Sequence, residues 1–314
     1  MLRYRIINAS RILIGILIFL IIGCTQQKDV EPMRSMYYWS TTFALDSTKT
    51  EFMEKHQVGR LYVRFFDVVQ NETHGALPNA TISFDGSQQD CKQEIVPVVY
   101  ILNDCMRHKN DSLPHHILNR VLQMCETHHI ENIKEIQIDC DWTKSTRNSY
   151  FAFMEELHKL TQEHNLKLSS TIRLHQLSQE PPKADKGVLM VYNTGDFRDR
   201  NEEKPILDVD VVLKYADYLS DYNLPLATAL PVFAWDLLFR GGTKFVGIQY
   251  KEGDYPIIEG DTLIHRQVEI DEILNSKKLL RHKRGTCCDE VVLYDISDLS
   301  INRYTEKEYE EMFD

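Results

Sequence analysis

Short apolar runs, rich in β-branched and aromatic residues, alternate with amphipathic stretches from residue 36 onward. Such runs are typical of strands. Eight of them predict strands, at residues 37–43, 60–68, 95–102, 133–140, 167–174, 188–192, 226–232 and 290–294. Residues 98–102 are apolar at every position, which indicates a strand covered on both faces. Because the intervening stretches have a helical period, the pattern predicts a parallel sheet.

The clearest helix is predicted at residues 145–164, where Tyr150, Met154 and Leu157 fall on one stripe and Ser145 can cap the first turn. Further helices are predicted at residues 112–129 and 209–222. The helices expected after the fifth and seventh strands have weak signals. Two consecutive glycines at 241 and 242 predict a turn leading into a hairpin at residues 245–250.

Eight strands within about 260 residues favour a (β/α)8 barrel over an open, doubly wound sheet. A Gly-rich phosphate loop follows none of the strands, which removes the main reason to expect a nucleotide-binding fold. We therefore predict a single α/β domain, a TIM-like barrel at residues 36–304. An acidic, helical C-terminal tail is predicted at residues 305–314.

The first residues differ from the rest of the chain, since three arginines precede an apolar run at residues 12–22. As a helix this run rises only about 16 Å, less than the roughly 30 Å of a bilayer core. It therefore predicts a signal peptide rather than a membrane span. The sequence Leu-Ile-Ile-Gly-Cys at 20–24 resembles the lipobox of bacterial lipoproteins. That resemblance implies a signal peptide at 1–23, a lipidated Cys24 and a tether at 24–35. A plain secretory signal and a short uncleaved anchor are the alternatives.

A lipidated Cys24 would carry several acyl chains, which together hold a protein stably on a membrane. The expected location is the bacterial cell envelope, with the outer membrane favoured and the barrel facing the periplasm or the exterior. The chain has 47 acidic and 36 basic residues and a net charge of −11. Because an acidic surface repels phosphate backbones, we do not expect nucleic acid as a partner.

Six cysteines follow Cys24, and their spacing is not typical of a zinc site, so we expect neither a metal nor a cofactor. Cys125 in a predicted helix and Cys140 in a predicted strand are expected to be buried thiols. An oxidising compartment would also allow a Cys91–Cys105 disulfide and a bridge to Cys287 or Cys288. The sequence does not decide between these pairings.

Candidate functional residues lie where the predicted strands end, because barrels carry their sites at the C-terminal ends of the strands. Asp139 and Asp141 alternate along the fourth strand and should face the same way, about 7 Å apart. Two carboxylates inside a barrel are costly unless they are used or paired. One interpretation is electrostatic or acid–base work on a sugar. The other is a buried salt-bridge cluster with Arg64 and Arg173.

The fourth and sixth strand ends resemble those of family 18 glycoside hydrolases, the chitinase-like barrels. Residues 139–143 (Asp-Cys-Asp-Trp-Thr) resemble the end of that family's D-x-x-D-x-D-W-E strand, and residues 190–193 (Met-Val-Tyr-Asn) resemble its M-x-Y-D. The resemblance implies that Asp141 assists the N-acetyl group of a substrate, with Asp139 as its partner and Tyr192 steadying it.

The chain departs from the family pattern at the position of the acid. Thr143 stands where the family has its proton-donating Glu, Ile136 where it has its first Asp, and Asn193 where it has the sixth-strand Asp. Residues 137–142, 171–177 and 190–197 also resemble a group of uncharacterised lipoproteins of Gram-negative bacteria, which brings no known activity.

The remaining candidates are one histidine and a set of possible sugar contacts. His175 should lie on the same side of its strand as Arg173 and is either a general acid or a structural residue. Tryptophan rings near strand ends either stack on the apolar face of a sugar or pack in the core. The candidate substrate-binding residues are Arg64, Asp67, Arg173, Asn193, Trp39, Trp142, Trp235 and Asp236.

These observations predict a glycan-processing lipoprotein whose acid site is atypical or degenerate, with His175, Asp67 or Asp236 as the substitute proton donor. The alternative is a non-catalytic lipoprotein that binds glycans or acts as a scaffold. An acid about 5–9 Å from Asp141 across an open cleft would favour hydrolysis. A mouth filled by side chains, with its carboxylates ion-paired, would contradict it.

Overall fold

The computed structural model describes residues 32–108, 110–131, 133–250 and 253–314, and the chain from Pro32 to Asp314 forms one compact unit. The predicted signal peptide and Cys24 lie outside the described residues. Within the described part of the chain, no helix is both long and apolar enough to cross a membrane.

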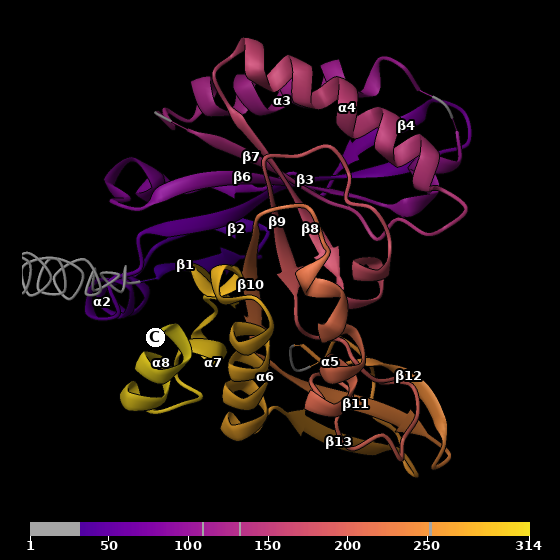
Figure 1. Cartoon of the computed structure of the whole chain (residues 1–314). Coiled ribbons are helices and arrows are strands. Elements are labelled where there is room, and N and C mark those ends of the chain that lie inside the picture. The colour runs from indigo at the N-terminus through magenta and orange to yellow at the C-terminus, as the bar shows by residue number, and fades with distance from the viewer. Residues whose placement is uncertain (1–31, 109, 132, 251–252) are drawn as a thin grey trace, which may run out of the picture. The chain divides into compact units, whose positions relative to one another are not determined.

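Eight parallel strands close into a barrel, because β1 pairs with both β14 and β3 (Figure 1). The strands are β1 (Met33–Tyr38), β3 (Arg60–Asn71), β6 (Glu94–Ile101), β7 (Glu135–Asp139), β8 (Lys167–Arg173), β9 (Lys186–Met190), β10 (Leu226–Pro231) and β14 (Glu290–Tyr294). The predicted (β/α)8 barrel in a single domain is therefore confirmed.

Seven of the barrel strands overlap their predicted ranges by three residues or more, whereas the first overlaps its range only at residues 37–38. The apolar run at 37–43 covers the end of β1 and a separate short strand, β2 (Thr42–Phe43), which pairs with β5 (Ser83–Phe84). The chain turns between them, and the Tyr38 hydroxyl donates to the carbonyl oxygens of Thr42 and Ala44 at 2.9 and 3.1 Å. Residues 33–35, expected in the tether, are the first half of β1.

The helices of the outer layer are α2 (Ser47–Lys55), α3 (Leu113–Thr127), α4 (Arg147–Glu163), α5 (Val209–Ala216), α6 (Ile270–Lys283), α7 (Asp298–Ile301) and α8 (Glu306–Phe313). Helices α3 and α4 pack on each other, as do α5 and α6 (Figure 1). Thr146, not Ser145, precedes the first residue of α4. After β8 comes only a short 3-10 helix, η3 (Leu174–Ser178), which explains the weak helical signal there.

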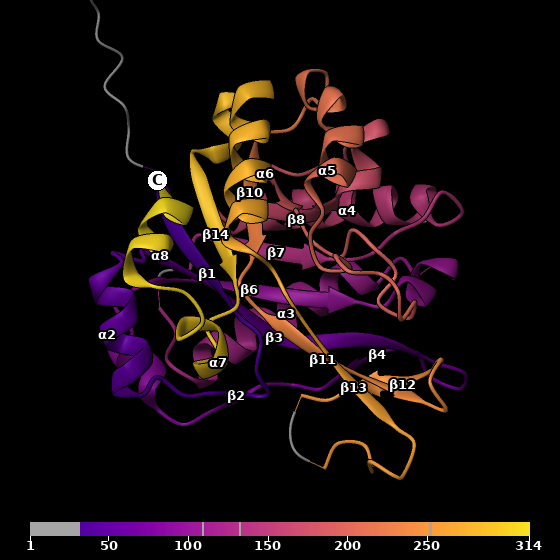
Figure 2. The same ribbon diagram turned by 90° about the horizontal axis from the view of Figure 1, so that it is seen from below.

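The C-terminal tail is helical as predicted, and its apolar face is part of the core. Thr305 caps α8 by accepting from the Glu308 backbone N–H, while the Glu308 carboxylate accepts from the Thr305 backbone N–H. Met312 and Phe313 are fully buried. Figure 2 shows α8 with α2 and α7 beside β1 and β14.

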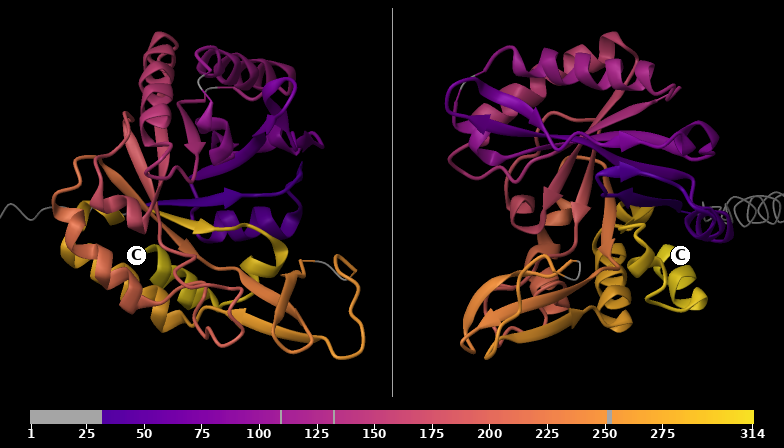
Figure 3. Two further views of the ribbon diagram at one scale, coloured as in Figure 1. Left: turned by 90° about the vertical axis from the view of Figure 1, so that its right-hand side faces the viewer. Right: turned by 180° about the vertical axis from the view of Figure 1, so that it is seen from behind.

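A second, antiparallel sheet follows the seventh barrel strand. It consists of β11 (Ala234–Arg240) between β12 (Lys244–Ile248) and β13 (Thr262–Gln267). The predicted Gly-Gly turn joins β11 to β12, and both glycines have positive φ, 58° and 83°, which other residues rarely adopt. The predicted hairpin is thus part of a three-stranded sheet that projects from the barrel (Figure 3).

Candidate functional site

A carboxylate pair shares one arginine at the C-terminal ends of β7 and β8. The Nη2 atom of Arg173 lies 3.3 Å from Oδ1 of Asp139, and its Nε donates to Oδ1 of Asp141. The Thr171 hydroxyl donates to Oδ1 of Asp139 at 2.7 Å. The side chain of Asp139 is 6% exposed, whereas that of Asp141 is 51% exposed. Arg173 therefore forms the salt bridges with Asp139 and Asp141 that one of the two interpretations of the sequence expected.

Burial dominates the electrostatics of this pair. It raises the pKa of Asp139, and the nearby Arg173 offsets only part of that increase, while the charge on Asp141 adds to it. Burial would lower the pKa of Arg173, but Asp139 and Asp141 together outweigh it and raise that pKa. Arg173 consequently stays charged, while Asp139 holds a proton to higher pH than an ordinary carboxyl group.

Arg64 belongs to a different ion pair. The sequence suggested one salt-bridge cluster that contains both Arg64 and Arg173, but in the structure the two arginines lie in separate ion pairs. Its Nε donates to Oδ1 of Asp67 at 2.7 Å, and its Nη2 donates to Oδ2. An irregularity in β3 between Arg64 and Phe66 brings residues three apart to the same side of the strand. The guanidinium also lies 5.5 Å from the ring centre of Trp39, a cation–π distance.

Four aromatic rings from the ends of different strands touch at the barrel mouth, and we call them the aromatic cluster: Trp39, Tyr192, Phe233 and Tyr294. Tyr294 is its centre, with ring centres 5.8 Å from Trp39, 5.4 Å from Tyr192 and 5.7 Å from Phe233. Sequence reasoning proposed Trp39 and Tyr192 but missed Tyr294 and Phe233. The sequence feature that could have identified Tyr294 is its position as the last residue of the eighth predicted strand.

The other two tryptophans are less open to a ligand than expected. Trp142 is fully buried and lies against Tyr150 and Phe151, at ring-centre distances of 6.1 and 5.3 Å, which overturns its predicted role in stacking on a sugar. Trp235 is 7% exposed and lies between Phe197 and Phe233.

The remaining predicted residues form no ion pair with Asp139 or Asp141. His175 is exposed on η3, and burial of part of its ring lowers its pKa, although Asp141 acts in the opposite direction. Asp236 lies on β11 and pairs with Nδ1 of His265 at 2.7 Å. Asn193 is exposed, with a positive φ of 57°. Tyr192 donates to the sulfur of Met190 at 2.9 Å, and burial raises its pKa.

All six cysteines of the described residues are free thiols. Cys125 and Cys140 are buried as expected, and neither of the disulfides that the sequence allowed is formed. No cluster of three or more His, Cys, Asp or Glu side chains suited to a metal ion occurs in the described ranges.

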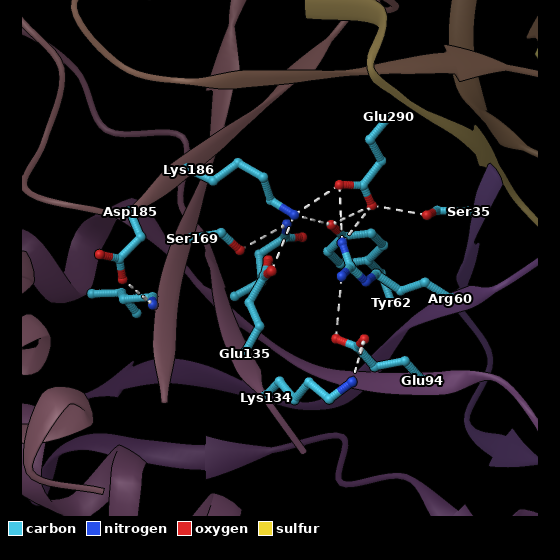
Figure 4. Close-up of polar contacts among 12 residues, drawn as sticks. Ser35, Arg60, Tyr62, Glu94, Lys134, Glu135, Ser169, Asp185, Lys186 and Glu290 are labelled. Carbon is cyan, nitrogen blue, oxygen red and sulfur yellow. Dashed lines mark hydrogen bonds and ion pairs between the residues drawn. The ribbon is translucent and has the colours of Figure 1, made fainter. Parts of the chain in front are cut away.

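A polar network that sequence reasoning missed lies at the opposite, N-terminal ends of the strands (Figure 4). Its centre is Glu290, which accepts from Ser35, Arg60, Tyr62 and Lys186 at 2.8–3.0 Å. Lys186 also donates to Glu135 at 3.0 Å. Burial would raise the pKa of Glu290, but Lys186 and Arg60 outweigh it and lower that pKa. Six of the eight barrel strands begin with a charged residue, and this pattern was the signal that the sequence offered.

The barrel resembles solved structures of proteins that act on polysaccharides. It matches the spore cortex-lytic enzyme SleL of Bacillus megaterium QM B1551 with a TM-score of 0.60 at 12% identity, over 90% of this chain and 74% of that chain. A chitinase of Chromobacterium violaceum gives a TM-score of 0.60 at 12% identity, over 90% and 98% of the two chains. A chitinase of Bacteroides thetaiotaomicron gives 0.56 at 12% identity, over 90% and 94%.

No protein-family model matches the chain, and no curated protein sequence matches it. At identities of 12% the three structural matches show a shared fold: a closed eight-stranded parallel barrel of the kind found in chitinases.

Proposed function

We propose that this protein binds a glycan at the C-terminal ends of its barrel strands and does not cleave it by the family 18 route. The observation that carries the proposal is the shared arginine. Arg173 pairs with both Asp139 and Asp141, the two carboxylates that the resemblance assigns to catalysis. A pair held in this way supplies a fixed, polar surface for hydroxyl groups rather than a free base.

The aromatic cluster and its half-buried member Trp39 support a sugar as the ligand. Sugar rings present apolar C–H faces that pack on aromatic rings, while their hydroxyl groups bond to charged side chains. Trp39, the Arg64–Asp67 pair and half-exposed Asp141 offer both kinds of contact at one end of the barrel. The likeness of the barrel to chitinases and SleL is consistent with this ligand class.

The position of the family's acid argues against hydrolysis by that route. Thr143 is exposed, and its hydroxyl group lies 2.9 Å from the Ser145 hydroxyl. A threonine hydroxyl group cannot donate a proton to a leaving oxygen at neutral pH. Among the substitutes considered, Asp67 and Asp236 are both paired.

Hydrolysis with His175 as the acid is the second candidate, favoured by one observation. The charge of Asp141 raises the pKa of His175, against the larger lowering by burial. Because the pKa of His175 is lowered, its ring is mostly neutral at pH 7 and is a proton donor only in acid. This candidate therefore requires activity that rises below pH 6.

A glycan array followed by a hydrolysis screen on the purified full chain separates the two candidates. We expect retention of at least one oligosaccharide class without new reducing ends, both at pH 7 and at pH 5. Turnover that Asp141→Asn abolishes would establish the hydrolase and refute the binding protein. Absence of retention on all glycans, by a folded sample, would refute both.

The proposal also includes a lipid anchor at Cys24 that holds the barrel on the outer membrane, facing the periplasm or the exterior. Metabolic labelling of the full chain with a palmitate analogue tests it. Wild type should incorporate the label and fractionate with outer membranes, and Cys24→Ala should do neither. Equal labelling of the two proteins would contradict the anchor.

A further inference from the structure

An apolar groove lies outside the barrel between α3 and β4 (Gly75–Asn79), the strand that pairs antiparallel with the extended end of β3. Its volume is about 560 Å3, within the usual range of about 300–1,000 Å3 for small-molecule sites. Phe66 and Val68 form part of its lining, together with Leu77, Leu113 and Ile117.

The groove is separate from the barrel mouth. Phe66 and Val68 flank Asp67, and neighbouring residues of a strand point to opposite faces. Asp67 pairs with Arg64 on the mouth side, so Phe66 and Val68 face the helix layer. A ligand in the groove would therefore not touch Asp139, Asp141 or the aromatic cluster.

One cation lies in this apolar lining without a counter-charge. Arg120 on α3 makes a single long hydrogen bond, from Nη1 to Oε1 of Gln123 at 3.3 Å. Its buried Nε has no hydrogen-bond partner, and no Asp or Glu of the described chain lies within ion-pair distance of its guanidinium. A guanidinium usually binds an anionic oxygen with two parallel N–H groups. Arg120 thus has unused donors beside an apolar surface.

The apolar lining of the groove and the positive charge of Arg120 together favour one class of ligand. An apolar surface with one arginine suits an aliphatic chain that ends in an anionic oxygen group, and it disfavours both a sugar and a cationic amphiphile. Strand addition by a peptide is disfavoured because Pro78 on β4 has no backbone N–H to donate.

We propose that the groove between α3 and β4 binds a single-chain aliphatic carboxylate, with its chain along the accessible residues Ala76, Leu77 and Pro78 and its head group on Arg120. Each methylene group buried in such a groove contributes about 0.8 kcal/mol, so affinity should rise about fourfold per methylene. The carboxylate satisfies N–H donors of Arg120 that now lack partners.

Isothermal titration of the full chain with octanoate, decanoate and dodecanoate, each below its micelle concentration, tests the proposal. We expect one site and tighter binding with each added pair of methylenes. Arg120→Gln should weaken decanoate binding at least tenfold and leave thermal unfolding unchanged. Arg107→Gln is the matched control, because Arg107 is exposed and already paired with Asp104. Ala76→Phe, which fills the groove, should abolish binding.

Three results would overturn the proposal. One is decanoate affinity that is equal in wild type and Arg120→Gln, and another is no binding by the folded wild type. The third is a stable dimer in sedimentation that Ala76→Phe disrupts, since a second copy would then cover the groove. A glycan-array result does not bear on it, because the two sites are separate.

Discussion

The two ends of the barrel each hold a buried carboxylate, Glu290 and Asp139, and the pKa values of the two are shifted in opposite directions. At the N-terminal end, Glu290 contacts two cations, Arg60 and Lys186, and its pKa is lowered. These cations also pair with Glu94 and Glu135. At the C-terminal end, Asp139 shares Arg173 with Asp141, and its pKa is raised. The number of cations that contact a carboxylate, two for Glu290 and one for Asp139, and not burial alone, decides which charge state folding favours.

The contrast matches the division of labour expected in a barrel, with stability at one end and ligand contact at the other. The N-terminal network joins β1, β3, β7, β9 and β14 through Glu290 and Lys186, so its loss would loosen several strands together. The C-terminal pair joins only β7 and β8 and leaves half of Asp141 exposed. We therefore expect substitutions at the two ends to differ in size, in sign and in pH dependence.

The largest effect is expected from Glu290→Gln, which leaves the mostly buried cations Arg60 and Lys186 with only Glu94 and Glu135 as counter-charges. Removing one partner of a buried ion pair typically costs about 3–5 kcal/mol, and the free energy of unfolding in urea at pH 7 should fall by that amount. Because the pKa of Glu290 is lowered, its contribution is present above its unfolded pKa and is lost as pH falls through the folded one. The variant should therefore lose less stability in acid than wild type does.

The control for this variant is Asp217→Asn, which removes an exposed partner of Lys283. It should cost less than about 1 kcal/mol. A loss below about 1 kcal/mol in Glu290→Gln as well would mean that the N-terminal network does not stabilise the barrel.

A smaller loss is expected from Arg173→Gln, about 1–3 kcal/mol at pH 7. The reason is that Asp139 would then be a buried carboxylate without a cation. At pH 4.5 the difference from wild type should shrink, because Asp139 can take up a proton instead. Urea unfolding at the two pH values measures this. A loss of equal size at both would indicate lost packing rather than an uncompensated charge.

Asp139→Asn should have the opposite sign and raise stability at pH 7. Folded Asp139 keeps its proton to higher pH than the unfolded chain does, so wild-type stability falls as pH rises from the unfolded pKa toward the folded one. An amide avoids this loss and still accepts from Thr171. A decrease of about 2 kcal/mol or more would show that the Asp139 charge stabilises the fold, and the contrast with Glu290 would fail.

The smallest effect on stability is expected from Asp141→Asn, because half of that side chain is exposed to water and screened by it. The free energy of unfolding should change by less than about 1 kcal/mol. The same variant should still weaken glycan binding, since Asp141 is the open oxygen acceptor at the mouth. Normal glycan affinity with lowered stability would reverse the roles that we assign.

The sequence predicted the architecture because hydrophobic periodicity acts along whole strands and helices, as at β14, where the range agrees to the residue. It failed where two short elements share one apolar run, as at 37–43. The buried position of Trp142 does not follow from strand alternation, because β7 ends at Asp139 and the Trp142 backbone N–H donates to the Cys140 carbonyl oxygen at 2.8 Å. The position of Trp142 next to Asp141 in the sequence does not place its ring at the barrel mouth.

The site itself was only half predictable. Asp139, Asp141 and Arg173 were identified because their spacing places them on one face of neighbouring strands. That Arg64 would pair with Asp67 instead depends on a local irregularity of β3, which no pattern of residues signals. Tyr294 and Glu290 gain their roles from contacts with residues more than 100 positions away in the chain, and a single sequence does not record such contacts.

The central claim is that the C-terminal end of the barrel is a glycan-binding surface, and the measurement that tests it most directly is titration of the folded full chain with the best oligosaccharide of the array. We predict saturable binding that Trp39→Ala weakens about three- to tenfold and Trp142→Phe leaves unchanged, because Trp142 is buried. Affinity that Trp39→Ala does not alter, or that Trp142→Phe reduces as much, would contradict the account.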